Sequence, residues 1–359
     1  MIGSSETMRI TWMLSLVLAT IWLPSLVLGQ SEIALHWSEL PPLPGKIGLA
    51  GPFAGAHNGV LMVGGGANFP DKMPWEGGNK VWHEDVFVLD SPDGTWKVAG
   101  KLPRPLGYGV SLSTDQGLVC LGGSDSQQHY GECFVLRWDD GTLVTSAIAS
   151  LPKPCANFCG AILNNTLYVA GGIETPTATV AMKSFWSLDL RDSDSNWKEL
   201  ETWPGPPRML AVAAVQDNAF YVVGGASLTV DVQGKPVRKY EKDAYRYRAE
   251  QGWTRVADLP RPVVAAPTPA PTLGLSQFLV MGGDDGMHVN FMPPALHPGF
   301  PKSILAYDTI LDAWGVHGQV PASHVTTTVV PWRGGFVIPS GEIRPGVRST
   351  SVWIGQPQN

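Results

Sequence analysis

Short apolar segments that end on a pair of glycines recur along the chain. Each has three apolar residues before the glycines, which is strand length and too short for a helix. The copies are Leu61–Gly65, Val119–Gly123, Tyr168–Gly172, Tyr221–Gly225 and Leu279–Gly283, with Val337–Gly341 as a weaker sixth. They follow one another at intervals of 49 to 58 residues. This spacing predicts an array of six structural repeats.

Two more apolar segments follow each glycine pair. A loop of variable length leads to a second strand, as in Asp85–Asp90 or Phe185–Asp189. A segment that begins at tryptophan then runs to Leu-Pro or a similar pair, as in Trp96–Pro103 and Trp253–Pro260. Two-residue connections such as Asn164–Asn165 fit β-hairpins, because asparagine tolerates the positive φ of tight hairpin turns. We therefore expect an all-β fold.

This order of segments resembles the kelch repeat. The resemblance implies that residues 30–359 form a six-bladed kelch-type β-propeller, with four strands in each blade around a central channel. The glycine pairs would let backbones crowd near the axis, and one tryptophan per blade would fill the space between neighbouring blades. These glycines and tryptophans are accordingly interpreted as structural.

The two ends of the chain are expected to share one blade. After Pro321 only three strands are predicted, at 324–330, 335–340 and 351–355. The missing tryptophan strand is found at the other end, at Ala34–Pro41. We therefore expect Leu35–Leu40 to pair with Ser351–Gly355, which would remove two sheet edges and close the ring.

Residues 1–29 differ in composition from the rest. Arg9 precedes an almost uncharged apolar run, Ile10–Leu28, which contains Pro24 and is followed by Gly29. This pattern is typical of a cleaved export signal, and an uncleaved membrane anchor is the alternative. No other stretch approaches the length of a membrane span. We expect an exported protein, periplasmic or secreted, with no stable span after signal removal.

The charge and the cysteines narrow the function classes. The net charge is −6, without a basic stripe, which argues against nucleic-acid binding. The cysteines show no spacing typical of zinc sites. In an exported protein Cys120 and Cys133, or Cys155 and Cys159, could form disulfides, and buried free thiols are the alternative.

Cations follow several tryptophan segments, in loops expected on the same face of the propeller as the long loops inside the repeats. They are Arg104, Lys153, Arg208 and Arg261. A rim of cations over a channel would suit a small anionic ligand, since low-dielectric walls focus the field. The alternative is that these residues brace neighbouring blades.

The segment Gly341–Ser349 carries the main candidate chemistry. It lies between two apolar segments, and its two glycines and Pro345 predict a tight loop that holds Glu342, Arg344 and Arg348. Charged groups on a loop above a rigid scaffold are typical of functional sites. A solvated surface ion pair is the alternative explanation.

This segment resembles the Gly-Glu-x-(Lys/Arg)-Pro-Gly-x-Arg motif of the bacterial sialic acid mutarotases, also called N-acetylneuraminate epimerases. Three other stretches agree with that family: Gly64–Phe69 followed by Gly78–Lys80 and His83, Tyr108–Leu112, and Pro204–Arg208. Their order along the chain is rotated, which resembles the cyclically permuted branch. A closed ring tolerates such a rotation, because the order of blades around the axis is unchanged.

The resemblance implies an enzyme that interconverts the α and β anomers of N-acetylneuraminate or a related keto-sugar acid by acid/base ring opening. Glu342 would move the proton, and Arg348 would bind the substrate carboxylate in a bidentate fashion. Further substrate-binding candidates are Arg208, Asn79, Lys80, His83 and Arg344. No cofactor or metal is implied, and the oligomeric state is left open.

Two other functions compete with this interpretation. A sialidase is a six-bladed propeller that acts on the same sugar. Ser91–Trp96 resembles its Asp-box only once, however, and no arginine triad or nucleophilic tyrosine can be placed. A non-catalytic kelch interaction module is the second alternative. Acidic and basic residues that converge at the channel mouth would favour the enzyme, and an apolar rim would favour the module.

Overall fold

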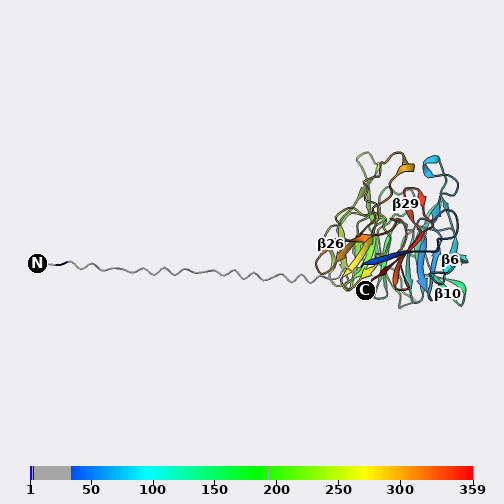
Figure 1. Ribbon diagram of the computed structural model, residues 1–359, viewed down its shortest axis with the longest axis horizontal. Coiled ribbons are helices and arrows are strands. Elements are labelled where there is room, and N and C mark those ends of the chain that lie inside the picture. The colour runs from blue at the N-terminus through cyan, green and yellow to red at the C-terminus, as the bar shows by residue number, and fades with distance from the viewer. Residues whose placement is uncertain (2, 4–33, 193, 359) are drawn as a thin grey trace. The chain divides into compact units, whose positions relative to one another are not determined.

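Antiparallel strands make up almost all of the regular structure in the computed structural model (Figure 1). The structure describes residues 1, 3, 34–192 and 194–358. The expected export signal, residues 1–29, therefore lies almost entirely outside the described residues. The expected all-β fold is confirmed for the described part of the chain, where the only helices are the short 3-10 turns η1 (Pro74–Glu76) and η2 (Pro294–Leu296). No helix there is long and apolar enough to cross a membrane.

Six four-stranded sheets follow the six repeats. Sheet 1 contains β2 (Phe53–His57), β3 (Val60–Gly64), β6 (Asp85–Leu89) and β7 (Lys97–Lys101). Sheet 2 contains β8 (Val110–Thr114), β9 (Gly117–Ser124), β10 (His129–Asp139) and β11 (Thr142–Ile148). Sheet 3 contains β12 (Cys159–Leu163), β13 (Thr166–Ala170), β14 (Phe185–Asp189) and β15 (Lys198–Glu199).

Sheets 4 to 6 have the same strand order. Sheet 4 contains β17 (Val212–Gln216), β18 (Ala219–Val223), β21 (Ala244–Arg248) and β22 (Gly252–Val256). Sheet 5 contains β23 (Thr272–Leu273), β24 (Gln277–Met281), β25 (Ser303–Asp308) and β26 (Ala313–Gln319). Sheet 6 contains β27 (Val330–Trp332), β28 (Gly335–Pro339), β31 (Val352–Pro357) and β1 (Leu35–Leu40).

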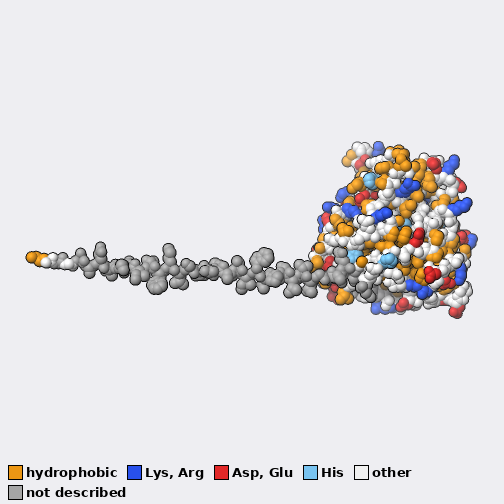
Figure 2. All heavy atoms as spheres, in the orientation of Figure 1, with side chains coloured by type: hydrophobic (Ala, Val, Ile, Leu, Met, Phe, Trp, Pro, Cys, Tyr) orange, Lys and Arg blue, Asp and Glu red, His pale blue; other side chains and the backbone are white. Residues whose placement is uncertain are grey.

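Smaller sheets form within the long loops. One contains β16 (Arg208–Met209), β19 (Ala226–Val230) and β20 (Pro236–Tyr240). Two are two-stranded: β4 (Ala67–Asn68) with β5 (Val81–Trp82), and β29 (Glu342–Arg344) with β30 (Val347–Arg348). In Figure 1, β29 lies toward the end of the molecule where the long loops gather. On the face drawn in Figure 2, acidic and basic side chains are interspersed among hydrophobic ones.

The N-terminal strand completes the C-terminal sheet. β1 pairs with β31 in antiparallel fashion, with Leu35 opposite Pro357 and Leu40 opposite Val352. This is the predicted pairing. The inner strand of the same sheet differs from the prediction, because β27 begins at Val330 and not near His324. The chain at Val325 instead pairs with Glu342, and Thr326 adopts a left-handed conformation that a strand does not allow.

The hydrophobic core is divided among the sheets. Each of six buried clusters joins two neighbouring sheets, and the cluster with Leu61 and Val337 joins sheet 1 to sheet 6. Four tryptophans reinforce this packing, because their indole N–H groups donate to carbonyls of the preceding repeat: Trp96, Trp197, Trp253 and Trp314. Trp253 bonds to Glu201 at 2.8 Å and Trp314 to Ala257 at 2.8 Å. The structural role expected for the tryptophans is thus observed.

Six backbone amides, one before each sheet, form a cycle of hydrogen bonds. The amides of Gly51, Tyr108, Asn157, Leu210, Ala265 and Thr326 each donate to the carbonyl of the preceding member, and Gly51 donates to Thr326, over 2.7 to 2.8 Å. We call this set the amide cycle. All six residues have φ between 54 and 64°, which costs about 1–2 kcal/mol for a residue other than glycine. A cavity of only about 50 Å³ lies among them.

The cysteines are buried and carry free thiols. Cys120 and Cys133 lie on the neighbouring strands β9 and β10, as expected, but neither they nor Cys155 and Cys159 are joined. Burial raises the pKa of Cys133 to about 12, so this thiol stays protonated and unreactive. The alternative of buried free thiols is the one observed.

Candidate functional site

Glu342 and Arg348 lie opposite each other on a β-hairpin. Their backbones are paired between β29 and β30, and Arg348 Nη2 lies 3.2 Å from Glu342 Oε2. The other carboxylate oxygen, Oε1, accepts a hydrogen bond from the amide of Gly346 at 2.8 Å. The Glu342 side chain is 18% exposed and that of Arg348 only 4%. The pair is therefore partly buried and held by the backbone, unlike a solvated surface ion pair.

The hairpin is fixed to the rest of the molecule by its backbone. The amide and carbonyl of Glu342 both bond to Val325, which directly precedes Thr326 of the amide cycle. The amide of Gly341 donates to Leu49, and the Ser340 hydroxyl, fully buried, lies 2.7 Å from the amide of Leu49. These bonds place Glu342 next to the amide cycle on a rigid support.

Arg348 keeps buried donors that have no partner among the described residues. Its Nε and Nη1 atoms are buried without a hydrogen bond, and its guanidinium lies 4.7 Å from the centre of the Phe69 ring. An unpaired buried donor costs about 1–3 kcal/mol, so a ligand that accepts hydrogen bonds from these two groups would gain affinity. Because a guanidinium is a planar fork, its free N–H groups suit a carboxylate.

The β4–β5 ribbon places a second cation, Lys80, near the same Phe69 ring that Arg348 contacts. Alternate residues of a strand face opposite sides, which puts Phe69, Lys80 and Trp82 on one face of the ribbon. Lys80 Nζ lies 6.0 Å from the Phe69 ring centre and 5.3 Å from that of Trp82. Lys80 Nζ also lies 5.0 Å from the ring centre of Tyr108, a member of the amide cycle. Phe69 thus contacts both Lys80 and Arg348.

This cluster of aromatic rings and cations keeps hydrogen-bond donors without partners among the described residues. The lysines that form ion pairs among the described residues are Lys97, Lys101, Lys153 and Lys239, so Lys80 has no carboxylate partner there. The indole N–H of Trp82 is buried and also unpaired. Together with Arg348, these groups make a positively charged, donor-rich surface next to one carboxylate. Such a surface can bind an anion that also carries oxygen acceptors.

His83 lies on the other face of the ribbon. It is placed there with Asn68, and its Nε2 is 2.9 Å from Asn68 Oδ1. Burial lowers the pKa of His83, and the nearby Asp85 carboxylate only partly offsets this. The structure thus brings Lys80 together with Arg348 but separates His83 from them. Asn79 is exposed, next to Lys80 in the chain.

Arg344 contacts the loop between β24 and β25 of sheet 5. Its Nη1 donates to the carbonyl of Ala295 at 2.9 Å, in the loop between β24 and β25, and its Nε is buried without a partner. One part of this guanidinium is therefore structural and one N–H remains available. Gly299 of the same loop lies close to the carbonyl of Ile343, so loop and hairpin are packed together.

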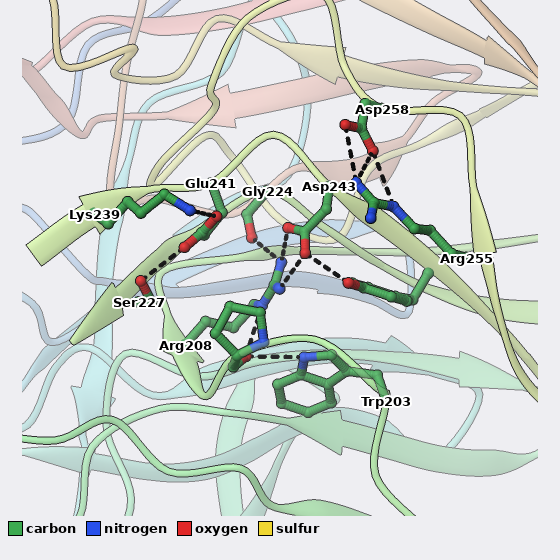
Figure 3. A network of polar contacts seen from close by, with 11 residues as sticks. Trp203, Arg208, Gly224, Ser227, Lys239, Glu241, Asp243, Arg255 and Asp258 are labelled. Carbon is green, nitrogen blue, oxygen red and sulfur yellow. Dashed lines mark hydrogen bonds and ion pairs between the residues drawn. The ribbon is translucent and has the colours of Figure 1, made fainter. Parts of the chain in front are cut away.

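Arg208, an expected substrate-binding residue, is enclosed in a separate network (Figure 3). Its side chain is fully buried and makes a bidentate pair with Asp243, over 2.8 and 2.9 Å. It also donates to the carbonyls of Gly224 and Pro206. Burial by itself would raise the pKa of Asp243, but the hydrogen bonds and charge of Arg208 outweigh it and lower that pKa.

The expected rim of cations therefore behaves as a set of braces. Arg208 ties sheets 3 and 4 together, and its side chain has no exposed surface in this arrangement. Arg261 donates to the carbonyl of Gly282 at 2.8 Å, and Arg104 pairs with Glu132 at 3.2 Å. No contact among the described residues joins Arg208 to Glu342. The alternative that these arginines brace neighbouring blades accounts for their contacts.

His324 is a buried residue next to the hairpin that the sequence did not indicate. It is 1% exposed, and neither ring nitrogen has a hydrogen-bond partner among the described residues. Its Cβ lies 3.0 Å from where a side chain on Gly341 would begin, directly behind the hairpin. Burial lowers the pKa of His324 to about 4. A histidine before an apolar run resembles a core residue, so no sequence signal would have revealed it.

Comparison with known proteins relates the chain to one family. A family model described as N-acetylneuraminate epimerase matches residues 25–145 and 149–292, which include Lys80 and Arg208 but end before the Glu342 hairpin. An N-acetylneuraminate epimerase of Brucella melitensis is 40% identical over 126 residues, 31% of this chain and 32% of that protein. One of Salmonella enteritidis is 43% identical over 102 residues, 25% of this chain and 26% of that protein.

These alignments span between a quarter and a third of the relatives' length. Among solved structures, that of YjhT superposes with a TM-score of 0.63 at 16% identity, over 89% of this chain and 99% of that one. At this identity the likeness concerns the fold alone. The β-propeller architecture expected from the repeats agrees with it.

Proposed function

This chain belongs to the N-acetylneuraminate epimerase family, and on that premise we propose that it interconverts the α and β anomers of N-acetylneuraminate or a closely related keto-sugar acid. The observation that carries the proposal is the partly buried Glu342–Arg348 pair, in which Arg348 keeps two unpaired donors. A base and an anion-binding fork are thereby held side by side at the channel mouth. No cofactor enters the proposed reaction.

Glu342 acts as the proton carrier. In the closed sugar, the anomeric hydroxyl gives its proton to one oxygen of the Glu342 carboxylate. The bond between the anomeric carbon and the ring oxygen breaks, and Glu342 passes that same proton to the ring oxygen, so the carboxylate is regenerated. The open form carries a ketone at the former anomeric carbon. Rotation about the bond between this carbon and the sugar chain presents the other face of the ketone. Reversal of the proton transfers then closes the ring on that face. General acid–base help of this kind contributes roughly 10²–10⁴-fold in rate.

Arg348 and Lys80 bind the sugar acid. The carboxylate on the anomeric carbon accepts hydrogen bonds from Arg348 Nη1 and from the second N–H of Nη2, the end-on fork of the guanidinium, which fixes the reacting carbon beside Glu342. Lys80 supplies a second positive charge, and the Phe69, Trp82 and Tyr108 rings around it offer apolar surface to the C–H groups of the sugar. Arg344 keeps one N–H available at the edge of the site.

The convergence of Glu342, Arg348 and Lys80 favours an enzyme over a binding module, since their charges meet at one point and not around an apolar rim. The experiment that tests the function is proton NMR of freshly dissolved α-N-acetylneuraminate. The protein should bring the anomers to equilibrium faster than the spontaneous reaction. An unchanged rate at saturating protein would refute the proposal.

We also propose that the six sheets are the blades of one closed propeller. Support comes from the pairing of β1 with β31, from the cluster shared by sheets 1 and 6, and from the amide cycle. Export to the periplasm or outside the cell, with removal of residues 1–29, belongs to the same proposal. It is motivated by the apolar run at Ile10–Leu28.

A further inference from the structure

A cavity of about 480 Å³ lies on the second face of the β4–β5 ribbon. Asn68 and His83 line it, and they are the two residues that the ribbon directs away from Phe69 and Lys80. The segment 43–49 forms another wall and is held next to the hairpin, because Leu43 donates to the carbonyl of Thr350 and Leu49 accepts from the amide of Gly341. The ribbon and this segment therefore separate the cavity from the Glu342 site.

The polar groups of the cavity suit hydroxyl groups. The Asn68 side chain donates to the carbonyl of Gly48 at 3.1 Å, which leaves its Oδ1 to accept from His83 Nε2. The neutral imidazole then has Nδ1 as a free acceptor. Asp85 adds an exposed carboxylate acceptor, and Lys46 adds an exposed donor. One cation and one carboxylate balance, so the cavity has no preference for an anion.

The remaining walls are apolar. Ile47, Leu49 and Phe87 contribute faces against which the C–H groups of a sugar ring could pack. The volume falls within the roughly 300–1,000 Å³ of small-molecule sites, and it exceeds what a few waters need. The chemistry and size together correspond to a neutral sugar, with hydroxyls for the polar groups and a carbon skeleton for the apolar walls.

We propose that this cavity is a second binding site, separate from Glu342, for a neutral, hydroxyl-rich ligand of monosaccharide or disaccharide size. The site goes beyond the proposed anomer interconversion and does not depend on it. Its residues differ from those that surround Arg348, since Asn68 and His83 face away from them. A neutral sugar and N-acetylneuraminate should therefore bind independently.

Saturation-transfer NMR on the full chain tests this, with methyl β-D-galactopyranoside and lactose as probes at millimolar concentrations. Either probe should give a signal with the wild-type protein and with Glu342→Gln. The signal should fall several-fold with His83→Ala, Asp85→Ala and Lys46→Ala. Lys97→Ala is the matched control, because Lys97 is exposed on the same sheet and pairs with Asp90. This control should bind like the wild type.

Three results would overturn the proposal: no signal from either probe, undiminished binding in the Lys46 and Asp85 variants, or competitive displacement of the probe by N-acetylneuraminate. Lys46 and Asp85 are exposed, so these two variants decide the matter even if His83→Ala folds poorly. Anomer interconversion measured on the same samples separates the two proposals. Loss of activity in Glu342→Gln with retained galactoside binding would show two sites.

Discussion

Arg348 holds Glu342 from across the hairpin, its Nη2 3.2 Å from Oε2, while the amide of Gly346 holds the other carboxylate oxygen. Both carboxylate oxygens are thus occupied by donors of the same hairpin. The carboxylate is oriented without help from a distant element. The two residues nevertheless serve different steps in the proposed reaction, so their substitutions should have different effects.

Glu342→Gln should slow anomer interconversion by about a hundredfold or more, because the amide keeps the shape of the side chain but cannot exchange the proton. Affinity for N-acetylneuraminate should change little. Proton NMR gives the rate, and calorimetric titration gives the affinity. A variant that retained full activity would show that Glu342 is structural. A variant that lost only affinity would move the proton transfer to another residue.

Arg348→Lys should weaken binding of the carboxylated sugar by about 1.5–3 kcal/mol, since lysine keeps the charge but loses the planar fork. The rate at saturating sugar should fall less than the affinity does. Calorimetric titration and saturation kinetics separate the two effects. Equal affinity in wild type and variant would exclude bidentate binding by Arg348.

Asp243→Asn should destabilise the protein by about 3–5 kcal/mol, because it leaves the fully buried Arg208 guanidinium without its carboxylate. The activity of the molecules that remain folded should be unchanged. Urea denaturation measures the free energy of unfolding. The control is Asp217→Asn, which removes the exposed pair with Arg248 and should cost no more than about 1 kcal/mol. A raised KM with unchanged stability would instead place Arg208 in the substrate site.

Acid should destabilise the protein through His324. Its pKa is about 4 in the folded state, below the ordinary value of 6.5, so the unfolded chain binds more protons between these values. Stability should be fully present above pH 6.5 and fall as the pH drops toward 4, by up to about 3 kcal/mol from this residue. His324→Gln should flatten that part of the profile in urea denaturation, and His36→Gln, on the exposed side of β1, should not. Parallel profiles for wild type and His324→Gln would contradict this.

Deletion of residues 34–40 should destabilise the protein far more than deletion of residues 231–235. The first removes β1 and exposes the edge of β31, where Trp37 packs on Gly355. The second removes only the tip of the β19–β20 hairpin. Thermal unfolding compares the two. An unchanged melting temperature without β1 would refute the proposed closure of the ring.

The repeating segments were sufficient to predict the strands and the joining of the two chain ends, because strand period, glycine pairs and tryptophans are local signals. Gly341–Ser349 was predicted as a tight loop from its glycines and proline, whereas the structure shows that it forms a two-stranded hairpin of its own. Contacts between residues far apart in the chain could not be predicted from the sequence. The pairing of Arg208 with Asp243, 35 residues away, turns an expected ligand residue into a brace. Phe69 carries no local sign that it contacts both Lys80 and Arg348.

The amide cycle was also not predictable from local preference. Leu210 and Thr326 rarely adopt positive φ, and nothing near them in the sequence marks a turn of that kind. Their conformation is imposed by the hydrogen bonds of the cycle, to which each repeat contributes one residue. The same effect displaced β27 from its expected position. The number of blades and the closure of the ring stay proposals that these bonds support.

The amide cycle also has a directional property. Its six hydrogen bonds run head to tail around the axis in one rotational sense, so their dipoles nearly cancel when summed. Dipoles aligned along a helix add instead, which gives each helix end a partial charge. The amide cycle is therefore a hydrogen-bonded ring with little net dipole, unlike a helix end. The preference for an anion therefore comes from side chains such as Arg348 and Lys80. A few substitutions among them could change the charge of the ligand that binds, while the backbone hydrogen bonds of the amide cycle stay intact.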